Sequence, residues 1–188
     1  VFLVASVNRF TNWGVMRSSL FHGGTVLTVD QDDRVLAGGW IAVRDGRITA
    51  TGPRDSTPST ADFDEAVDLT GHLVMPGLVN GHTHAAQVLF RGRAEGRSLL
   101  TMDGWYNSIR EPELSLVGSD IGPAVALSCA EMALSGTTTF CDQYFFAEEI
   151  AAAVKDAGLR AVIAYGIVQL GDEARGRREL AAATAFLE

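Results

Sequence analysis

A run of apolar residues that ends in two histidines constrains this sequence more than any other feature. Residues 73–79 read LVMPGLV, and Asn80 and Gly81 then lead into His82-Thr83-His84. A run without polar alternation is typical of a strand buried on both faces, as in a parallel sheet. Side chains at positions i and i+2 of a strand point to the same side, so two imidazoles can face one metal ion. The pattern predicts a metal site at the C-terminal tip of a strand, where barrel enzymes keep their active sites.

From residue 73 onwards the sequence alternates between strand and helix patterns. Apolar residues at i, i+4, i+8 and i+11 predict a helix over 119–135, with Ser119 as N-cap and Gly136 just beyond its end. Such alternation predicts βαβ crossovers and a parallel sheet. The later elements are expected at Thr137–Cys141 (strand), Ala147–Ala157 (helix), Arg160–Val168 (strand) and Glu173–Glu188 (helix). These make about three βα units, whereas a (β/α)₈ barrel takes roughly 250 residues.

Residues 18–75 have the composition of strands and turns. Asp45-Gly46 between two β-rich segments is typical of a type I′ hairpin. The region predicts a small antiparallel sheet, which has too few strands to bury both of its faces. Residues 1–15 are expected to be upstream or disordered sequence. The strands are expected at Leu20–Val29, Trp40–Val43, Arg47–Ala50, Val67–Leu69 and His72–Val74.

Charge and cysteine content exclude several classes of partner. The net charge of the 188 residues is −8, which disfavours a polyanion such as nucleic acid. No apolar run reaches the length of a membrane span, so no membrane partner is expected. Cys129 and Cys141 lie in no C-x-x-C pair, which suits a reducing cytoplasm.

The string VMPGLVNGHTH, followed by LFRG, resembles the first barrel strand of the amidohydrolase superfamily. Within it, the chain is similar to the branch of cytosine/guanine deaminases, S-adenosylhomocysteine deaminases and triazine hydrolases, from about Ser18 to the end. The resemblance implies the N-terminal part of a TIM-type barrel at 76–188, preceded by part of a small β-sandwich at 16–75. In that family the remaining sandwich strands come from the far C-terminus, so the chain is expected to be an N-terminal fragment.

The resemblance also implies a chemistry. His82 and His84 would bind Zn²⁺, with Fe²⁺ as the alternative because imidazole suits both metals. A catalytic zinc takes three protein ligands and a water whose pKa it lowers towards ~7. The resulting hydroxide would attack a ring carbon that carries an amine or a halide, which deaminates or dechlorinates a purine, pyrimidine or triazine. The remaining ligands and the proton-transfer Glu and His are expected beyond residue 188, so the catalytic residues stay unassigned and the isolated chain is expected to be inactive.

Three residues are candidates for the substrate pocket by the same resemblance. Trp105 stands where the family has a tryptophan before its pocket, and Glu113, or alternatively Glu111, matches a carboxylate that binds a ribose. Gln143, or alternatively Tyr144, follows the second strand. The expected partner is therefore a small heterocyclic molecule, and barrel enzymes of this type often form homodimers.

Arg91 in Leu89-Phe90-Arg91-Gly92 matches the L-x-R-G pattern of the family. We expect it to tether the loop by hydrogen bonds to loop carbonyls.

Two other functions remain open on the sequence. One is a cyclic-amide hydrolase of the same superfamily, similar to imidazolonepropionase or dihydroorotase. The dihydroorotase type often carries a carboxylated lysine, whereas the only lysine here is Lys155, on a predicted outer helix. The other is a non-catalytic, truncated α/β module.

Overall fold

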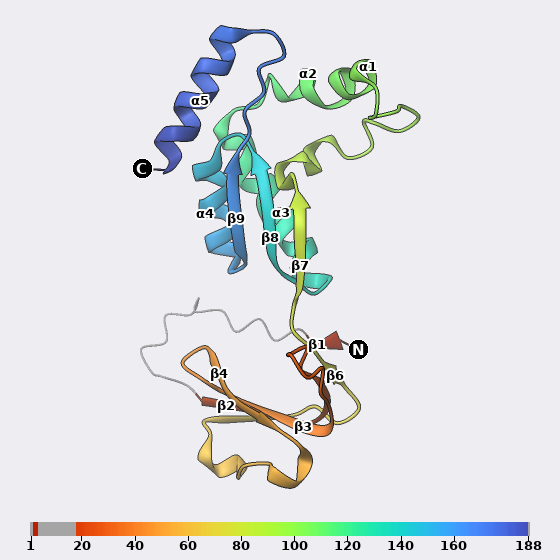
Figure 1. Cartoon of the computed structure of the whole chain (residues 1–188), viewed down its shortest axis with the longest axis vertical. Helices are drawn as coiled ribbons and strands as arrows, with labels where there is room; N and C mark the ends of the chain where they lie inside the picture. The colour runs from red at the N-terminus through yellow and green to blue at the C-terminus, as the bar shows by residue number, and fades with distance from the viewer. Residues whose placement is uncertain (1, 4–17, 188) are drawn as a thin grey trace. The chain divides into compact units, whose positions relative to one another are not determined.

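The computed structural model describes residues 2–3 and 18–187 (Figure 1). The chain divides into two compact units, Val1–Leu78 and Val79–Glu188, which are treated separately below. The expectation that residues 1–15 are upstream or disordered falls outside the described residues, apart from the short strand β1 at Phe2–Leu3.

The first unit is a six-stranded mixed sheet. The antiparallel pairing predicted for this region holds for β2, β3 and β4. The remaining strands differ from the prediction, because β5 and β6 both pair with β2 in parallel. The chain reaches these parallel positions by crossing over through the connector 53–64 instead of by a tight turn. The strands are β2 (Ser18–Leu27), β3 (Val35–Arg44), β4 (Arg47–Gly52), β5 (Glu65–Asp68) and β6 (Leu73–Val74).

The predicted hairpin is present between β3 and β4. Asp45 and Gly46 have φ angles of 52° and 70°. Positive φ at both central residues is what a type I′ turn requires, and its twist matches that of the flanking strands.

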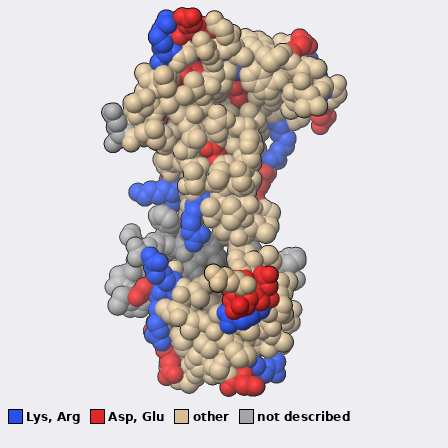
Figure 2. Space-filling model, viewed as in Figure 1, with Lys and Arg blue, Asp and Glu red and all other residues tan. Residues whose placement is uncertain are grey.

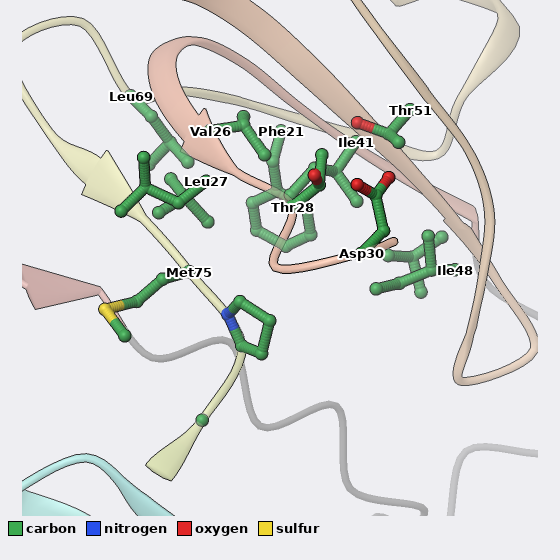
Figure 3. A pocket seen from close by; sticks show the side chains of 14 residues that line it. Phe21, Val26, Leu27, Thr28, Asp30, Ile41, Ile48, Thr51, Leu69 and Met75 are labelled. Carbon is green, nitrogen blue, oxygen red and sulfur yellow. The ribbon is translucent and has the colours of Figure 1, made fainter. Parts of the chain in front are cut away.

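Two small clusters of buried side chains stabilise this unit. Leu20 is completely buried and packs with Trp40 and Ala42, with Phe63 against them. A second cluster, formed by Val26, Leu69 and Val74, borders a pocket of about 310 Å³ (Figure 3). The pocket lining is mainly aliphatic and includes Ile41, Ile48 and Met75.

The second unit contains a three-stranded sheet in the order β7-β8-β9. The arrows of the three strands point the same way in Figure 1, and the register of β8 with β9 is parallel. The predicted α/β class with parallel strands is therefore confirmed. Its main elements are β7 (Leu78–Thr83), α3 (Gly118–Leu134), β8 (Thr137–Tyr144), α4 (Ala147–Ala157), β9 (Arg160–Tyr165) and α5 (Glu173–Leu187).

The core of this unit lies between the sheet and helices α3 and α4. Ile121, Val125 and Cys129 on α3 are 0–1% exposed, which confirms the predicted apolar stripe. They pack with Phe140 of β8 and Ile150 of α4. The positions of β8 alternate, so that one face of the strand packs on the helices and the other does not.

The start of α3 differs from the prediction. The N-cap is Val117, and Ser119 lies inside the first turn. The carboxylate of Asp120 accepts a hydrogen bond of 3.0 Å from the Val117 N–H. The acidic side chain in the first turn thus satisfies the backbone N–H of the N-cap residue itself, which is a different donor from the one that a Ser119 N-cap would satisfy.

Strand β7 was predicted to be buried on both faces, but Leu78 and Val79 are 50% and 69% exposed. β7 is an edge strand of its sheet. None of the described helices has the length and apolar character of a membrane span. The long loop that follows β7 contains short helical segments. The segments are η3 (Ala85–Phe90), α1 (Met102–Trp105), η4 (Tyr106–Arg110) and α2 (Glu111–Glu113).

Candidate metal centre

The two histidines of the His-x-His sequence lie side by side where β7 ends. His82 is an exposed residue of β7, and His84 directly precedes η3. The centroids of their rings are 4.9 Å apart, and the ring planes are nearly perpendicular at 82°. Two imidazoles at this separation can share one metal ion.

The orientation of His84 is set by the neighbouring strand. Its Nδ1 lies 2.7 Å from the backbone carbonyl oxygen of Gln143, at the end of β8. Because a carbonyl oxygen only accepts hydrogen bonds, Nδ1 carries the proton and donates it. In a neutral imidazole this leaves Nε2 free to bind a metal, and metal-binding histidines are commonly held in this tautomer by such a contact.

A buried carboxylate on β8 holds the backbone that follows His84. Asp142 is 2% exposed, and its Oδ1 accepts a hydrogen bond of 2.8 Å from the Ala85 N–H. The Ser128 hydroxyl of α3 donates to the Ala85 carbonyl oxygen at 2.7 Å. Burial raises the pKa of the Asp142 carboxyl, whereas the Ala85 N–H and the nearby His84 act in the opposite direction.

The donor set fits part of a catalytic zinc site. Imidazole nitrogens are ordinary zinc ligands, and a catalytic zinc takes three protein ligands. Within residues 2–3 and 18–187, no group of three or more His, Cys, Asp or Glu side chains is placed to hold a metal ion. The described residues would therefore provide two of the ligands, not a complete site.

Glu113 is linked through Gln87 to the segment that follows His84, and it is not a surface carboxylate. Its side chain is 4% exposed and accepts hydrogen bonds from Gln87 Nε2 at 3.1 Å and from Arg110 Nη1 at 3.4 Å. Tyr144, whose ring centroid is 6.4 Å from that of His84, is its neighbour. Burial and then the Glu113 carboxylate raise the pKa of the Tyr144 hydroxyl above its usual range.

The other residues predicted from the sequence have different settings. The backbone of Gln143 contacts His84, and its exposed side chain follows the opposite alternation to buried Tyr144. Trp105 is half-buried at the end of α1. Arg91 tethers the loop, although its partner is a carboxylate instead of loop carbonyls. It forms two hydrogen bonds of 2.9 and 2.7 Å with Glu131 of α3.

Sequence reasoning overlooked Asp142, Gln87 and Arg110 as members of the site. Asp142 could have been recognised from the sequence, because it is a charged residue at a position of β8 where the alternation places buried side chains. Arg110 and Glu113 have the i, i+3 spacing of a helical ion pair. Nothing in the sequence indicated that this pair is buried.

Comparisons with known proteins identify relatives of this chain. Residues 73–186 match the model of the amidohydrolase family. The 5'-deoxyadenosine deaminase of Methanosarcina mazei is 39% identical over 173 residues, which are 92% of this chain and 38% of that protein. The 5-methylthioadenosine/S-adenosylhomocysteine deaminase of Desulforudis audaxviator is 44% identical over 136 residues, which are 72% of this chain and 31% of that protein.

Solved structures show the same fold. The atrazine chlorohydrolase TrzN of Arthrobacter aurescens TC1, crystallised with zinc, aligns with a TM-score of 0.72 and 25% identity, over 84% of this chain and 37% of that one. An adenosine deaminase from Xanthomonas campestris with bound zinc aligns with a TM-score of 0.71 and 29% identity, over 85% and 38% of the two chains.

The chain thus spans about a third of the length of these relatives, at 31–38%. The family match covers β7, in which His82 lies, and His84 directly after it. It also covers helices α3 and α4 and strands β8 and β9. On this match, the chain belongs to the amidohydrolase family.

Proposed function

We propose that this chain supplies the first metal ligands and one side of the substrate pocket of a zinc-dependent hydrolase that deaminates an adenine nucleoside. The observation that carries the proposal is the His82–His84 pair, in which His84 is fixed through Nδ1 by the Gln143 carbonyl. The proposal is supported by deaminases of adenosine analogues at 39–44% identity. Because the chain covers only about a third of their length, the activity is proposed for the enzyme that includes this chain.

Each residue has a role in this proposal. His82 and His84 would hold the zinc, which when bound lowers the pKa of water towards neutrality. The Gln143 carbonyl would keep His84 in the Nδ1–H tautomer, and Asp142 would fix the backbone beside it. Glu113 would accept hydrogen bonds from substrate hydroxyl groups, and Trp105 and the Gln143 side chain would line the pocket. The remaining zinc ligand and the proton-transfer groups would come from barrel strands outside this chain.

An amine is the leaving group that the relatives favour. The structural neighbour TrzN is a chlorohydrolase, so a halide on a triazine is the second candidate. We prefer deamination because the adenosine-analogue deaminases are the more similar in sequence, at 39–44% against 25% identity. The relatives reported above are named as deaminases and a chlorohydrolase, which supports substitution at a ring carbon over the imidazolonepropionase-like alternative.

The experiment is a comparison of His82→Ala with His72→Ala in the active enzyme. His72 lies in the first unit, where its Nδ1 contacts the Thr70 carbonyl, so it is a matched histidine outside the site. We expect H82A to lose bound zinc and ammonia release from 5'-deoxyadenosine, while H72A retains both. If H82A keeps wild-type zinc content and turnover, the proposal is wrong. Chloride release from atrazine without ammonia release from any nucleoside would replace deamination by dechlorination.

Several sequence predictions belong to the same proposal. We propose zinc over iron, which metal analysis of the purified enzyme would decide. We retain a cytoplasmic location and a homodimer as predictions. Nucleic acid remains an unlikely ligand on charge grounds, and on the face seen in Figure 2 basic and acidic side chains are interspersed.

The aliphatic pocket of the first unit also fits this proposal. We propose that further strands of the β-sandwich cover its aliphatic lining in the full enzyme.

A further inference from the structure

Arg110 is a buried arginine with partners from several parts of the second unit. Its side chain is 4% exposed. Nη1 lies 3.4 Å from Glu113 Oε2, and Nη2 lies 3.4 Å from Glu179 Oε1. Its guanidinium carbon stands 4.8 Å from the centre of the Phe145 ring. A planar group with donors on both sides can bind two carboxylates and stack on a ring at once.

These partners lie on segments that follow three different strands. Arg110 and Glu113 belong to the loop that follows β7, Phe145 follows β8, and Glu179 is on α5, beyond β9. All three loops leave the sheet at the end to which the strand arrows point (Figure 1). His82 and His84 lie at the same end, which is where parallel α/β enzymes place their ligands.

Glu179 extends the connection into the loop after β9. Its Oε2 accepts a hydrogen bond from the Val168 N–H. One carboxylate therefore joins the start of that loop to α5, and Arg110 joins this carboxylate to Glu113. Gln87, three residues beyond His84, binds the other oxygen of Glu113 at 3.1 Å.

We propose that Arg110 is a positioning residue that ties the loops after β7, β8 and β9 into one rim and holds Glu113 in place to accept hydrogen bonds from the substrate. The role of Glu113 towards the substrate rests on the proposed function, whereas the connection of the three loops by Arg110 does not. Glu113 can serve in this way because a carboxylate offers about four acceptor positions, of which Arg110 and Gln87 use two and the neighbouring Tyr144 hydroxyl can take a third.

The first experiment measures amide exchange of Val168 in the 188-residue chain, without metal or substrate. Arg110→Lys keeps the positive charge but replaces two separate donor nitrogens by one, so it cannot span Glu113 and Glu179. We expect the Val168 amide to exchange roughly tenfold faster in R110K, because Glu179 loses the partner that holds it. Arg110→Met should accelerate exchange at least as much. If R110M does not melt cooperatively, R110K alone decides.

Arg91→Lys is the matched control. Arg91 follows the same strand and forms a two-bond pair with Glu131, but it has no contact with the rim among its described partners. R91K should leave Val168 exchange unchanged. An unchanged Val168 exchange rate in R110K, or an equal acceleration in R91K, would overturn the proposed connection of the three loops.

The second experiment tests the substrate clause by kinetics of the active enzyme. Arg110→Lys and Glu113→Gln should each raise KM for the nucleoside roughly tenfold, with kcat and zinc content near wild type. Because Arg110 is inferred to act through Glu113, R110K/E113Q should show the KM of E113Q alone. Separate effects that multiply in the double variant would overturn this clause. A wild-type enzyme that turns over no nucleoside would refute the proposed function, and the exchange experiment would still decide the rim.

Discussion

Asp142 illustrates how a single side chain can hold the backbone of the candidate metal centre without being one of its predicted ligands. It contacts neither imidazole directly in the described hydrogen bonds, but it fixes the backbone at Ala85. Hydrogen bonds to charged groups are the stronger ones, and a buried one is costly to lose. The backbone directly after His84 is therefore held by a carboxylate that lies 57 residues beyond Ala85 in the chain.

Asp142→Ala should reduce both stability and metal affinity. The Ala85 N–H would lose its acceptor, which costs about 1–3 kcal/mol of unfolding free energy. Zinc affinity of the active enzyme should fall about 10–100-fold, as is usual for residues that orient metal ligands. Asp142→Asn keeps an acceptor oxygen and should retain most of both. Urea unfolding and zinc titration measure the two effects.

Asp120→Ala is the control for this experiment. Asp120 also accepts a backbone hydrogen bond, from Val117 at the start of α3. D120A should lower stability without changing zinc affinity. Equal losses of affinity in D120A and D142A would show that Asp142 affects the metal only through general stability.

The two cysteines should differ sharply in reactivity. Cys129 is 1% exposed, and burial raises the pKa of its thiol to about 11, whereas Cys141 is partly exposed on β8. The thiolate is the reactive form, so a raised pKa keeps Cys129 protonated and inert at neutral pH. Iodoacetamide should label Cys141 alone in the native chain and both cysteines in urea. Rapid native labelling of Cys129 would contradict the burial of α3 against the sheet.

At the scale of elements, some features follow from the local sequence and others depend on contacts between distant segments. The Asp45-Gly46 turn forms where local chemistry predicts it, because a type I′ turn depends on two φ angles. The pairing of β5 and β6 with β2 was not predictable in this way, since parallel partners are joined by long connections.

Gly46→Ala should destabilise the first unit by about 1 kcal/mol, because its φ of 70° is in the left-handed region. Gly122→Ala provides the opposite case. Gly122 lies in α3, and an added Cβ would meet nothing within 4 Å. It should stabilise by up to about 1 kcal/mol, since alanine is the better helix former. Denaturant unfolding of both variants checks the signs, and a stabilising G46A would refute the assigned turn.

At the scale of the whole molecule, the described residues contain separate cores. Leu20 belongs to a cluster of the first unit, and Ile121 to the main cluster of the second. Both side chains are completely buried. Each core is a local packing problem, so a cavity in one should first weaken the elements that line it.

Leu20→Ala and Ile121→Ala should each cost about 2–5 kcal/mol in the unit that contains the residue. Amide exchange resolves the two effects. L20A should increase exchange in β3 and β4 and leave β8 protected, and I121A should do the reverse. Loss of protection in both units with either variant would show that the two cores unfold together.

The sequence by itself determined the order of strands and helices, the β-hairpin, the helix stripe of Ile121, Val125 and Cys129, and the His82-x-His84 pair. These features depend on periodicity and on residues close together in the chain. Only the tertiary structure decided that Glu113 is buried, that Gln143 contributes its carbonyl to His84, and that Arg110 meets a carboxylate 69 residues further on. The physical reason is that periodicity tells which side of an element is buried, whereas the partner of a buried polar group depends on which distant segments the fold brings together.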